Sequence, residues 1–278
     1  MRMDLLQRLE NVGLTHFSAS QLNKPVANWM FDYVYLSSEE RRKKIVGENA
    51  AYGTAVHSAI QNILCNGLSA EDAIEDALMS YDFGRTDVST EKGVKFREML
   101  PSAVHSGLEL MSEMFTGSIE EKRIELKMDD VALPIIGFVD LLNDDKKIFG
   151  EIKSKAPRQG AVRKDGTRGW TKGLIPRAPT HEHVLQCAIY AKATGYKPNL
   201  IYVSAEGGHI FNEDNCEKLS DAYLSYALEE VRRKCILRQN LLAVSDDPKV
   251  LAGLIEPDFG TFWWDDESME EARELWKI

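Results

Sequence analysis

Residues 137–155, GFVDLLNDDKKIFGEIKSK, place charged side chains inside what reads as one apolar hairpin. If DDKK forms the turn, Asn143 pairs with Ile148, and counting back along both strands sets Asp140 opposite Glu151. The two Cβ atoms would then lie about 5 Å apart on one face of the sheet. Two carboxylates this close repel each other, and burying unpaired charge is costly, so the pair predicts a bound cation.

Lys153 follows two residues after Glu151 and projects from the same strand face. Hard cations such as Mg²⁺ take oxygen ligands and keep positions open for water and phosphate. An ammonium beside such an ion stabilises the charge that develops on a reacting phosphate. Asp140, Glu151 and Lys153 are therefore a minimal set for phosphodiester hydrolysis with Mg²⁺ or Mn²⁺. A surface hairpin whose Glu151 and Lys153 simply pair with neighbours is the competing interpretation of these three residues alone.

Composition indicates a globular intracellular protein. The chain has 278 residues, 44% of them hydrophobic, and a net charge of -10. No apolar run approaches the roughly 20 residues that a membrane helix needs, and the first residues lack the continuous apolar segment of a signal peptide. We expect a cytoplasmic protein, in the host cytoplasm if it is phage-encoded, with no membrane partner. We expect a single domain over residues 1–278, with a core at about 17–212 and a C-terminal helical extension at 213–278.

The four cysteines stand singly along the chain: Cys65, Cys187, Cys216 and Cys235. Close CxxC pairs, which zinc sites and many iron–sulfur sites use, do not occur among them. They therefore predict reduced thiols without a disulfide framework.

Hydrophobic periodicity predicts a mixed α/β layer fold with a small, mostly antiparallel sheet flanked by helices. Helical spacing covers about 49–64, 70–81, 91–115, 180–194 and 215–241, and a short helix follows a turn within 17–35. Alternating patterns predict strands at 122–128, 134–142, 147–153, 199–205 and 209–212. The C-terminal end is expected to be irregular.

The segment from about 156 to 179 has no hydrophobic periodicity and is predicted to be a long loop of functional importance. Its basic residues are suited to gripping phosphates, and its tryptophan is suited to stacking on an unpaired base. The predicted DNA-binding residues are Lys155, Arg158, Arg163, Lys164, Arg168, Trp170, Lys172 and Arg177. On a chain with a pI near 5.2, this indicates a local basic groove rather than a protein that coats nucleic acid.

Two predicted helices flank the hairpin in sequence and carry polar residues at the border of their apolar faces. The first has Gly53 and His57 one turn apart, and the second has Gln186 and Tyr190 one turn apart. Taken singly, each pair is more typical of an ordinary amphipathic helix than of a site.

The ordered set of these motifs, GxxxH, Asp, ExK and QxxxY, resembles the RecB-like branch of the PD-(D/E)xK nuclease superfamily. That branch includes the RecB and AddB nuclease domains, the mitochondrial genome maintenance exonuclease, CRISPR-associated RecB-like nucleases and many phage exonucleases. The resemblance runs from about residue 17, where HFSASQLN is similar to the family's first segment, to about residue 195.

The resemblance implies a restriction-endonuclease-like core and a role for each matching residue. Metal ligands would be His57, Asp140 and Glu151, together with the carbonyl of Ile152. Lys153 would be the catalytic lysine, supported by Gln186 and Tyr190, and Lys155 matches an extra polar position found in many members. Some members use a further acidic residue before the Asp strand, for which Glu121 and Glu125 both qualify. Several relatives also hold an iron–sulfur cluster, but this chain has neither the early cysteine nor the C-terminal trio, so no cluster is expected.

We therefore expect a Mg²⁺- or Mn²⁺-dependent DNA exonuclease that hydrolyses DNA from ends or single strands in replication, recombination or repair, of the phage or mitochondrial type. Its partner would be single-stranded or end-containing DNA, with a single-strand-annealing or replication protein as a further partner. Two alternatives stay open: a structure-specific or restriction-like DNA endonuclease, and a non-catalytic nucleic-acid-binding protein on the same fold.

Overall fold

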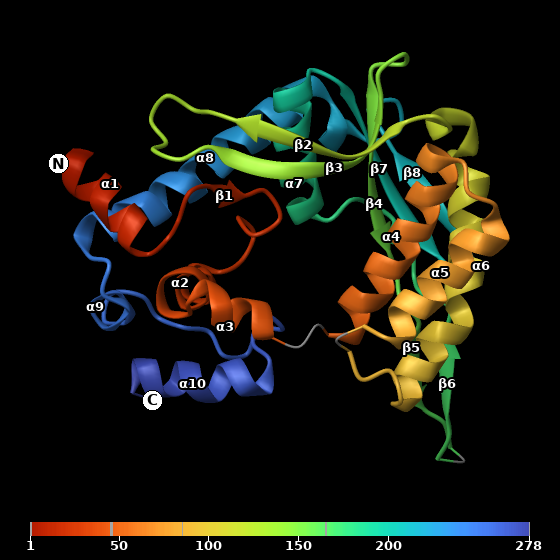
Figure 1. The fold of residues 1–278 in the computed structure, drawn as a ribbon, viewed down its shortest axis with the longest axis horizontal. Helices are drawn as coiled ribbons and strands as arrows, with labels where there is room; N and C mark the ends of the chain where they lie inside the picture. Colours follow the sequence, from red (N-terminus) through yellow and green to blue (C-terminus); the bar gives the residue numbers. More distant parts are fainter. Residues whose placement is uncertain (1, 45–46, 85, 165, 278) are drawn as a thin grey trace. The chain divides into compact units, whose positions relative to one another are not determined.

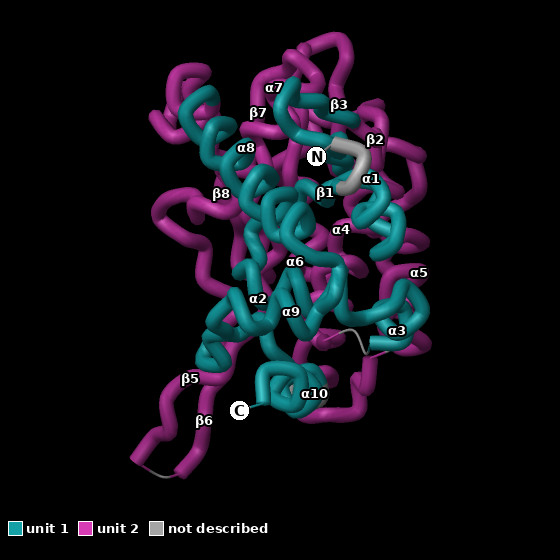
Figure 2. Tube along the Cα trace, turned by 90° about the vertical axis from the view of Figure 1, so that its left-hand side faces the viewer, with its two compact units in different colours: residues 1–44, 125–137, 225–278 teal, residues 45–124, 138–224 magenta. Residues whose placement is uncertain are grey.

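The computed structural model describes residues 2–44, 47–84, 86–164 and 166–277 (Figure 1). The chain divides into two compact units (Figure 2). Unit 1 comprises residues 1–44, 125–137 and 225–278, and unit 2 comprises residues 45–124 and 138–224. Every residue of the predicted metal, catalytic and DNA-binding sets belongs to unit 2. The prediction of a single domain stays a prediction.

A mixed β-sheet runs through the described residues. Its strands are β1 (Phe17–Ser18), β2 (Ile119–Leu126), β3 (Ile135–Asn143), β4 (Ile148–Ser154), β7 (Lys197–Ser204) and β8 (Gly207–Phe211). The order is β1-β3-β4-β7-β8, and β2 also pairs with β3. Mixed α/β architecture was the prediction, and it is confirmed.

The hairpin register predicted from residues 137–155 is confirmed at its turn. β3 and β4 are antiparallel, with Asn143 opposite Ile148. The side-chain oxygen of Asn143 accepts the backbone N–H groups of Asp145 (3.1 Å) and Lys146 (3.0 Å). This local bonding favours a turn over continued strand.

β4 and β7 are parallel over seven residue pairs, from Ile148 opposite Lys197 to Ser154 opposite Val203. The chain between them includes helix α7 (His181–Thr194), a crossover of the kind that parallel neighbours need. The sheet is therefore mixed: β1–β3 and β4–β7 are parallel, while β3–β4 and β7–β8 are antiparallel.

Helices α4 (Glu48–Asn66), α5 (Ala70–Asp82) and α6 (Glu91–Phe115) lie together beside β4, β7 and β8 (Figure 1). Their apolar faces share a core with Ile152, Ile201 and Val203. Residues between these on the strands face the other way, toward α7, where the Phe149 and Tyr190 rings lie 6.0 Å apart. Polar side chains on this second sheet face therefore meet α7.

The segment predicted as a loop contains a second, two-stranded sheet, formed by β5 (Arg158–Val162) and β6 (Arg168–Thr171). Its side chains are mostly exposed on both faces, so it has no alternating pattern and the loop prediction was wrong. The chain returns past β4 at Gly173, whose φ is +95°. A Cβ there would lie 2.1 Å from the Lys155 carbonyl oxygen, so only glycine fits.

Unit 1 contains mostly helices: α1 (Arg2–Asn11), α2 (Val26–Met30), the π-helical turn η1 (Phe31–Tyr35), α3 (Ser38–Lys43), most of α8 (Asp221–Val244), α9 (Pro248–Ala252) and α10 (Asp266–Trp276). The side chain of Arg238 is buried there and donates to the carbonyls of Leu22 and Lys24. α9 and α10 lie in the end of the chain that was predicted to be irregular. α10 is amphipathic, with Ser268, Ala272 and Leu275 buried at helical spacing.

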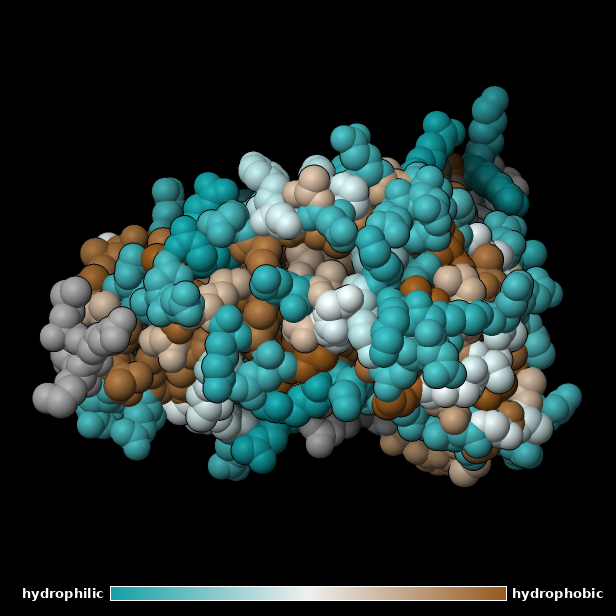
Figure 3. Space-filling view, turned by 90° about the horizontal axis from the view of Figure 1, so that it is seen from above, coloured by the Kyte–Doolittle hydropathy of each residue, from teal (hydrophilic) through white to brown (hydrophobic). Residues whose placement is uncertain are grey.

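Polar side chains cover much of the face seen in Figure 3, with apolar groups exposed between them. Among the helices of the described residues, none is long and apolar enough to cross a membrane.

Candidate active site

The open end of the β3–β4 hairpin holds the two predicted carboxylates. Backbone pairing continues from the turn to Leu141 opposite Gly150. One residue further, Oδ2 of Asp140 accepts the backbone N–H of Ile152 at 2.6 Å. Asp140 is 8% exposed and Glu151 only 2%. Both carboxylates are thus buried at this end, as the register predicts.

The surroundings of this carboxylate pair make it unfavourable for both groups to be ionised at once. Burial raises the pKa of Asp140, while the Lys153 ammonium and the Ile152 N–H pull it down. Burial also raises the pKa of Glu151, and the charge of Asp140 raises it further against the opposing pull of Lys153. The charge of Asp140 therefore makes ionisation of Glu151 harder, and a further positive charge would favour the ionised form of both buried carboxylates.

Lys153 joins this pair to helix α7. Its Nζ donates to Oε1 of Glu151 at 2.6 Å and to Oε1 of Gln186 at 3.0 Å. The amide of Gln186 in turn donates to Oη of Tyr190 at 2.9 Å. Burial opposes the charge on Lys153, but the neighbouring carboxylates outweigh it and raise its pKa. The predicted lysine and its two supporting residues are therefore brought together, with the ammonium held in one orientation.

His57 reaches the same end of the hairpin from α4. Its Nδ1 lies 3.9 Å from Oδ2 of Asp140. α4 approaches β4 closely at Gly53, where a Cβ would lie 3.1 Å from Oγ of Ser154. Burial, followed by the charge of Lys153, lowers the pKa of His57, so the ring is neutral. A neutral imidazole can accept a metal ion.

Gln61 is a site residue that the sequence reasoning missed. It is buried, and its Nε2 donates to the backbone carbonyl of Asp140 at 2.9 Å and to Oε1 of Glu121 at 3.1 Å. It lies four residues after His57, so it continues the stripe of α4 that Gly53 begins. This helical spacing from His57 is the sequence signal that could have identified Gln61.

Glu121 and Glu125 were the two candidates for the additional acidic residue of the site. Glu121 has a left-handed backbone, with φ of +47°, and its charge raises the pKa of both Asp140 and Glu151. Glu125 falls in unit 1 and pairs with Lys127 at 3.3 Å. The geometry favours Glu121, because strained backbone held beside buried charge is typical of functional sites.

The donor atoms at the open end suit a hard divalent cation. Oε2 of Glu151 and Nε2 of His57 are buried and have no hydrogen-bond partner. Within the described residues, no group of three or more His, Cys, Asp or Glu side chains stands close enough together to hold a metal ion. Mg²⁺ commonly binds through one or two carboxylates plus water and phosphate. The carboxylates of Asp140 and Glu151 match that requirement.

The predicted DNA-binding residues lie on and beside the β5–β6 hairpin. Exposed cationic side chains on it are Arg158, Arg163, Lys164 and Arg168, and the exposed Lys172 and Arg177 follow. Lys172 lies 3.7 Å from a carboxylate oxygen of Glu206. Trp170 differs from its predicted role: it is half-buried, packs on the core, and its Nε1 donates to Glu91 at 3.2 Å. Its ring anchors the hairpin base, because that large apolar surface is better buried than exposed.

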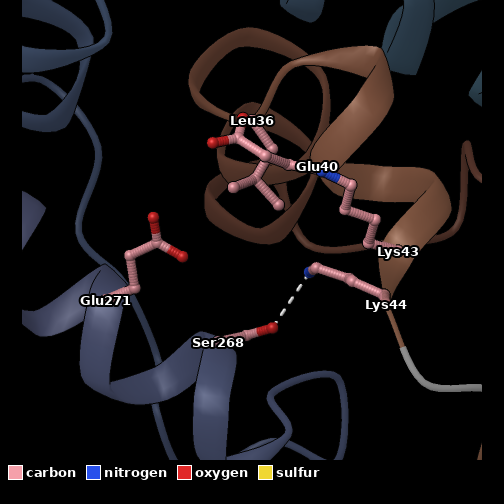
Figure 4. Close-up of a pocket in the computed structure, with 6 residues that line it drawn as sticks. All are labelled: Leu36, Glu40, Lys43, Lys44, Ser268 and Glu271. Atoms are coloured by element: carbon pink, nitrogen blue, oxygen red, sulfur yellow. Dashed lines mark hydrogen bonds between the residues drawn. The ribbon is translucent and has the colours of Figure 1, made fainter.

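A pocket in unit 1 offers no comparable chemistry (Figure 4). It is lined by Leu36, Glu40, Lys43, Lys44, Ser268 and Glu271. Lys44 donates to Oγ of Ser268 at 2.9 Å and to Oδ1 of Asp32 at 3.0 Å. None of these six lining residues has a buried side-chain nitrogen or oxygen without a hydrogen-bond partner, in contrast to Glu151 and His57 at the hairpin.

All four cysteines are free thiols, as predicted. The prediction that no iron–sulfur cluster is bound stays a prediction.

Comparisons with known proteins do not place the chain in a family. No protein-family model matches it, and no curated protein matches it. Among solved structures, one similar chain is described as the crystal structure of SSO0001, with 13% sequence identity, 84% of each chain covered and a TM-score of 0.28. This likeness is too weak to carry an argument about fold or function.

Proposed function

We propose that this protein is a metal-dependent deoxyribonuclease with a restriction-endonuclease-like core, and that it hydrolyses DNA from ends or single strands. One observation carries the proposal: two mutually repelling carboxylates, Asp140 and Glu151, are buried together beside the oriented ammonium of Lys153. Such an arrangement costs folding stability unless a ligand relieves it. A divalent cation would supply the missing positive charge, and the ion together with Lys153 could then bind the negative charge of a phosphodiester.

The residues at the open end have two different roles, metal binding and phosphate binding. Asp140, Glu151 and the Ile152 carbonyl would hold Mg²⁺ or Mn²⁺ together with water and phosphate. The neutral ring of His57 would join them only after moving closer, since the three side chains do not form a metal-binding group as they stand. When bound, such an ion supplies a water of lowered pKa and neutralises charge on the phosphate. Lys153 stays protonated and donates to a non-bridging phosphate oxygen, where charge grows during the reaction.

Gln186 and Tyr190 act through Lys153. The amide oxygen of Gln186 accepts from the lysine and its amide nitrogen donates to Tyr190, so the lysine cannot turn away from the carboxylates. Gln61 fixes Glu121 and the backbone of Asp140 in the same manner. Positioning of this kind lowers the reorganisation needed during the reaction.

The basic hairpin supports DNA as the substrate. Its exposed arginines and lysine suit phosphates, which carry no sequence information. This arrangement favours capture of any strand or end over recognition of a particular sequence.

The test is cleavage of matched linear and covalently closed single-stranded DNA with Mg²⁺, Mn²⁺ or EDTA. We expect metal-dependent loss of the linear form alone, and no loss with Asp140→Asn. Cutting of the closed circle would replace the exonuclease with an endonuclease at the same site. If neither form is cut while DNA is still bound, the protein is a binding module and the proposal is wrong.

A further inference from the structure

Lys155 lies one residue past the end of β4 and two residues beyond Lys153, so it projects from the same side as Lys153. Its backbone N–H still donates to the carbonyl of Val203 at 2.7 Å. It is half-buried, and within the described part of the chain its ammonium has no carboxylate partner. Nζ lies 4.8 Å from the centre of the Tyr202 ring. Burial and the nearby Arg158 and Lys153 lower its pKa. Three cations therefore gather here, and an anion would stabilise them.

Tyr202 links Lys155 to helix α7. It is fully buried on β7, opposite Lys153, and its Oη accepts the backbone N–H of Thr180 at 3.1 Å. Oη also lies 2.7 Å from Nδ1 of His183. Because the oxygen already accepts one hydrogen bond, its own hydrogen is best donated to Nδ1. That assignment leaves the N–H of His183 on Nε2, as a second hydrogen-bond donor beside the cations.

His183 belongs to the same side of α7 as Gln186, which lies one turn further along the helix. Lys155 and His183 both contact Tyr202, the first at its ring and the second at its Oη. Burial lowers the pKa of His183, and the charges of Lys153 and Lys155 lower it further. The neutral ring adds a donor without adding another repelling charge. Lys155 and His183 thus extend the donor set of Lys153 along β4, away from the hairpin turn.

We infer that Lys155 and His183, positioned by Tyr202, form a phosphate-binding subsite for the phosphodiester next to the one that is cut. The inference rests on the proposed function for the identity of the ligand as a nucleic-acid strand. Residues two apart in a strand are separated by about 6.6 Å, which suits consecutive phosphates. Lys153 would contact the reacting phosphate and Lys155 its neighbour.

The experiment measures the Kd of the full chain for a fluorescent single-stranded oligonucleotide over a range of NaCl concentrations, without divalent metal. The variants are Lys155→Gln, Lys155→Arg and Tyr202→Phe. Lys147→Gln is the matched control, because Nζ of Lys147 lies 4.9 Å from the Tyr196 ring at the opposite end of β4. Cleavage of the same oligonucleotide with Mg²⁺ is recorded in parallel.

We expect Lys155→Gln to weaken binding about tenfold and to reduce the slope of log Kd against log salt by about one, since one phosphate contact is lost. Lys155→Arg should restore the slope. Tyr202→Phe should weaken binding about threefold with the slope unchanged, because the charge remains and only its positioning is lost. Lys147→Gln should match wild type.

Equal slopes for Lys155→Gln and Lys147→Gln would overturn the subsite, as would wild type that binds no DNA. Wild type that binds DNA with the expected slopes but cleaves none would refute the nuclease while supporting the subsite. If Lys155→Gln left the Kd for DNA unchanged but raised the Kd for a phosphate-free acidic peptide, the cations would be assigned to a protein partner and the inference would be overturned.

Discussion

The two ends of the β3–β4 hairpin both carry polar and charged residues, but these are exposed and paired at one end and buried and partly unpaired at the other. At the turn end, Asn143 satisfies two backbone N–H groups, and Lys147 donates to Oη of Tyr196 at 3.0 Å in an exposed position. At the open end, Asp140 and Glu151 are buried side by side, and Oε2 of Glu151 has no partner. Both ends carry acidic and basic groups, those of the turn in residues 144–147 and those of the open end on β3 and β4.

This difference distinguishes polar residues that stabilise the folded structure from polar residues that lower its stability. Exposed, paired groups at the turn specify where the chain reverses. Buried, unpaired groups at the open end oppose folding and persist where a ligand can use them. The comparison predicts that open-end substitutions change activity, and that turn-end substitutions change stability.

Glu151→Gln is expected to have the largest effect. Cleavage should fall by about 10²- to 10³-fold, because a charged group at the reaction centre is lost. Without divalent metal, the melting temperature should rise by about 2–4 °C, which corresponds to relief of about 1 kcal/mol of repulsion. Thermal unfolding and single-turnover cleavage of the same preparation measure both.

The same variant also tests the pH dependence of stability. The folded pKa of Glu151 is raised above its ordinary value of 4.5, so its contribution to stability is present below pH 4.5 and is lost as pH rises through the folded pKa. Wild type should therefore lose stability with rising pH more steeply than Glu151→Gln. Parallel pH profiles would contradict the burial of an opposed carboxylate.

Gln61→Leu should have an intermediate effect. Removing the amide that holds Glu121 and the Asp140 backbone should raise the half-saturating Mg²⁺ concentration by about 10- to 100-fold, the usual cost of losing a partner of the ligands. Gln159→Leu is the control, because Gln159 Nε2 donates to a glutamate, Glu91, at a similar 3.2 Å. An unchanged Mg²⁺ dependence in Gln61→Leu would assign Gln61 to packing alone.

Asn143→Ala should affect only the fold. The substitution removes three hydrogen bonds: the two that Oδ1 accepts from backbone N–H groups, and the one that Nδ2 donates to the Met114 carbonyl at 2.7 Å. The free energy of unfolding should therefore fall by about 1–2 kcal/mol. Urea unfolding at constant m measures this change. Cleavage per folded molecule should stay at the wild-type rate, and a loss of activity there would break the distinction between the two ends.

Much of the fold follows from local patterns in the sequence. The turn at DDKK, the pairing of Asn143 with Ile148, and the helix over residues 91–115 were all predictable, because hydrophobic period and turn chemistry are local. The parallel pairing of β4 with β7 was not, since it depends on a crossover through α7. The β5–β6 hairpin escaped detection because neither of its faces is apolar.

The site residues also fall into those that the sequence predicts and those that it does not. Asp140, Glu151 and Lys153 are found by counting along two paired strands, and Gln186 by its place on a helix. Gln61 was missed although it lies one turn after His57, because its partners, Glu121 and the Asp140 carbonyl, are distant in the sequence. Trp170 was misplaced because sequence alone does not tell an anchoring aromatic ring from an exposed one.

The most direct test compares Lys153→Ala with Lys147→Ala in single-turnover cleavage of linear single-stranded DNA with saturating Mg²⁺. Lys153 lies on β4 at the open end of the hairpin, and Lys147 lies in the turn, one residue before β4 begins. We predict that Lys153→Ala loses at least about 10²-fold in rate while DNA binding and folding persist, and that Lys147→Ala cleaves like wild type. Equal rates for the two variants would contradict a catalytic site at the open end of the hairpin.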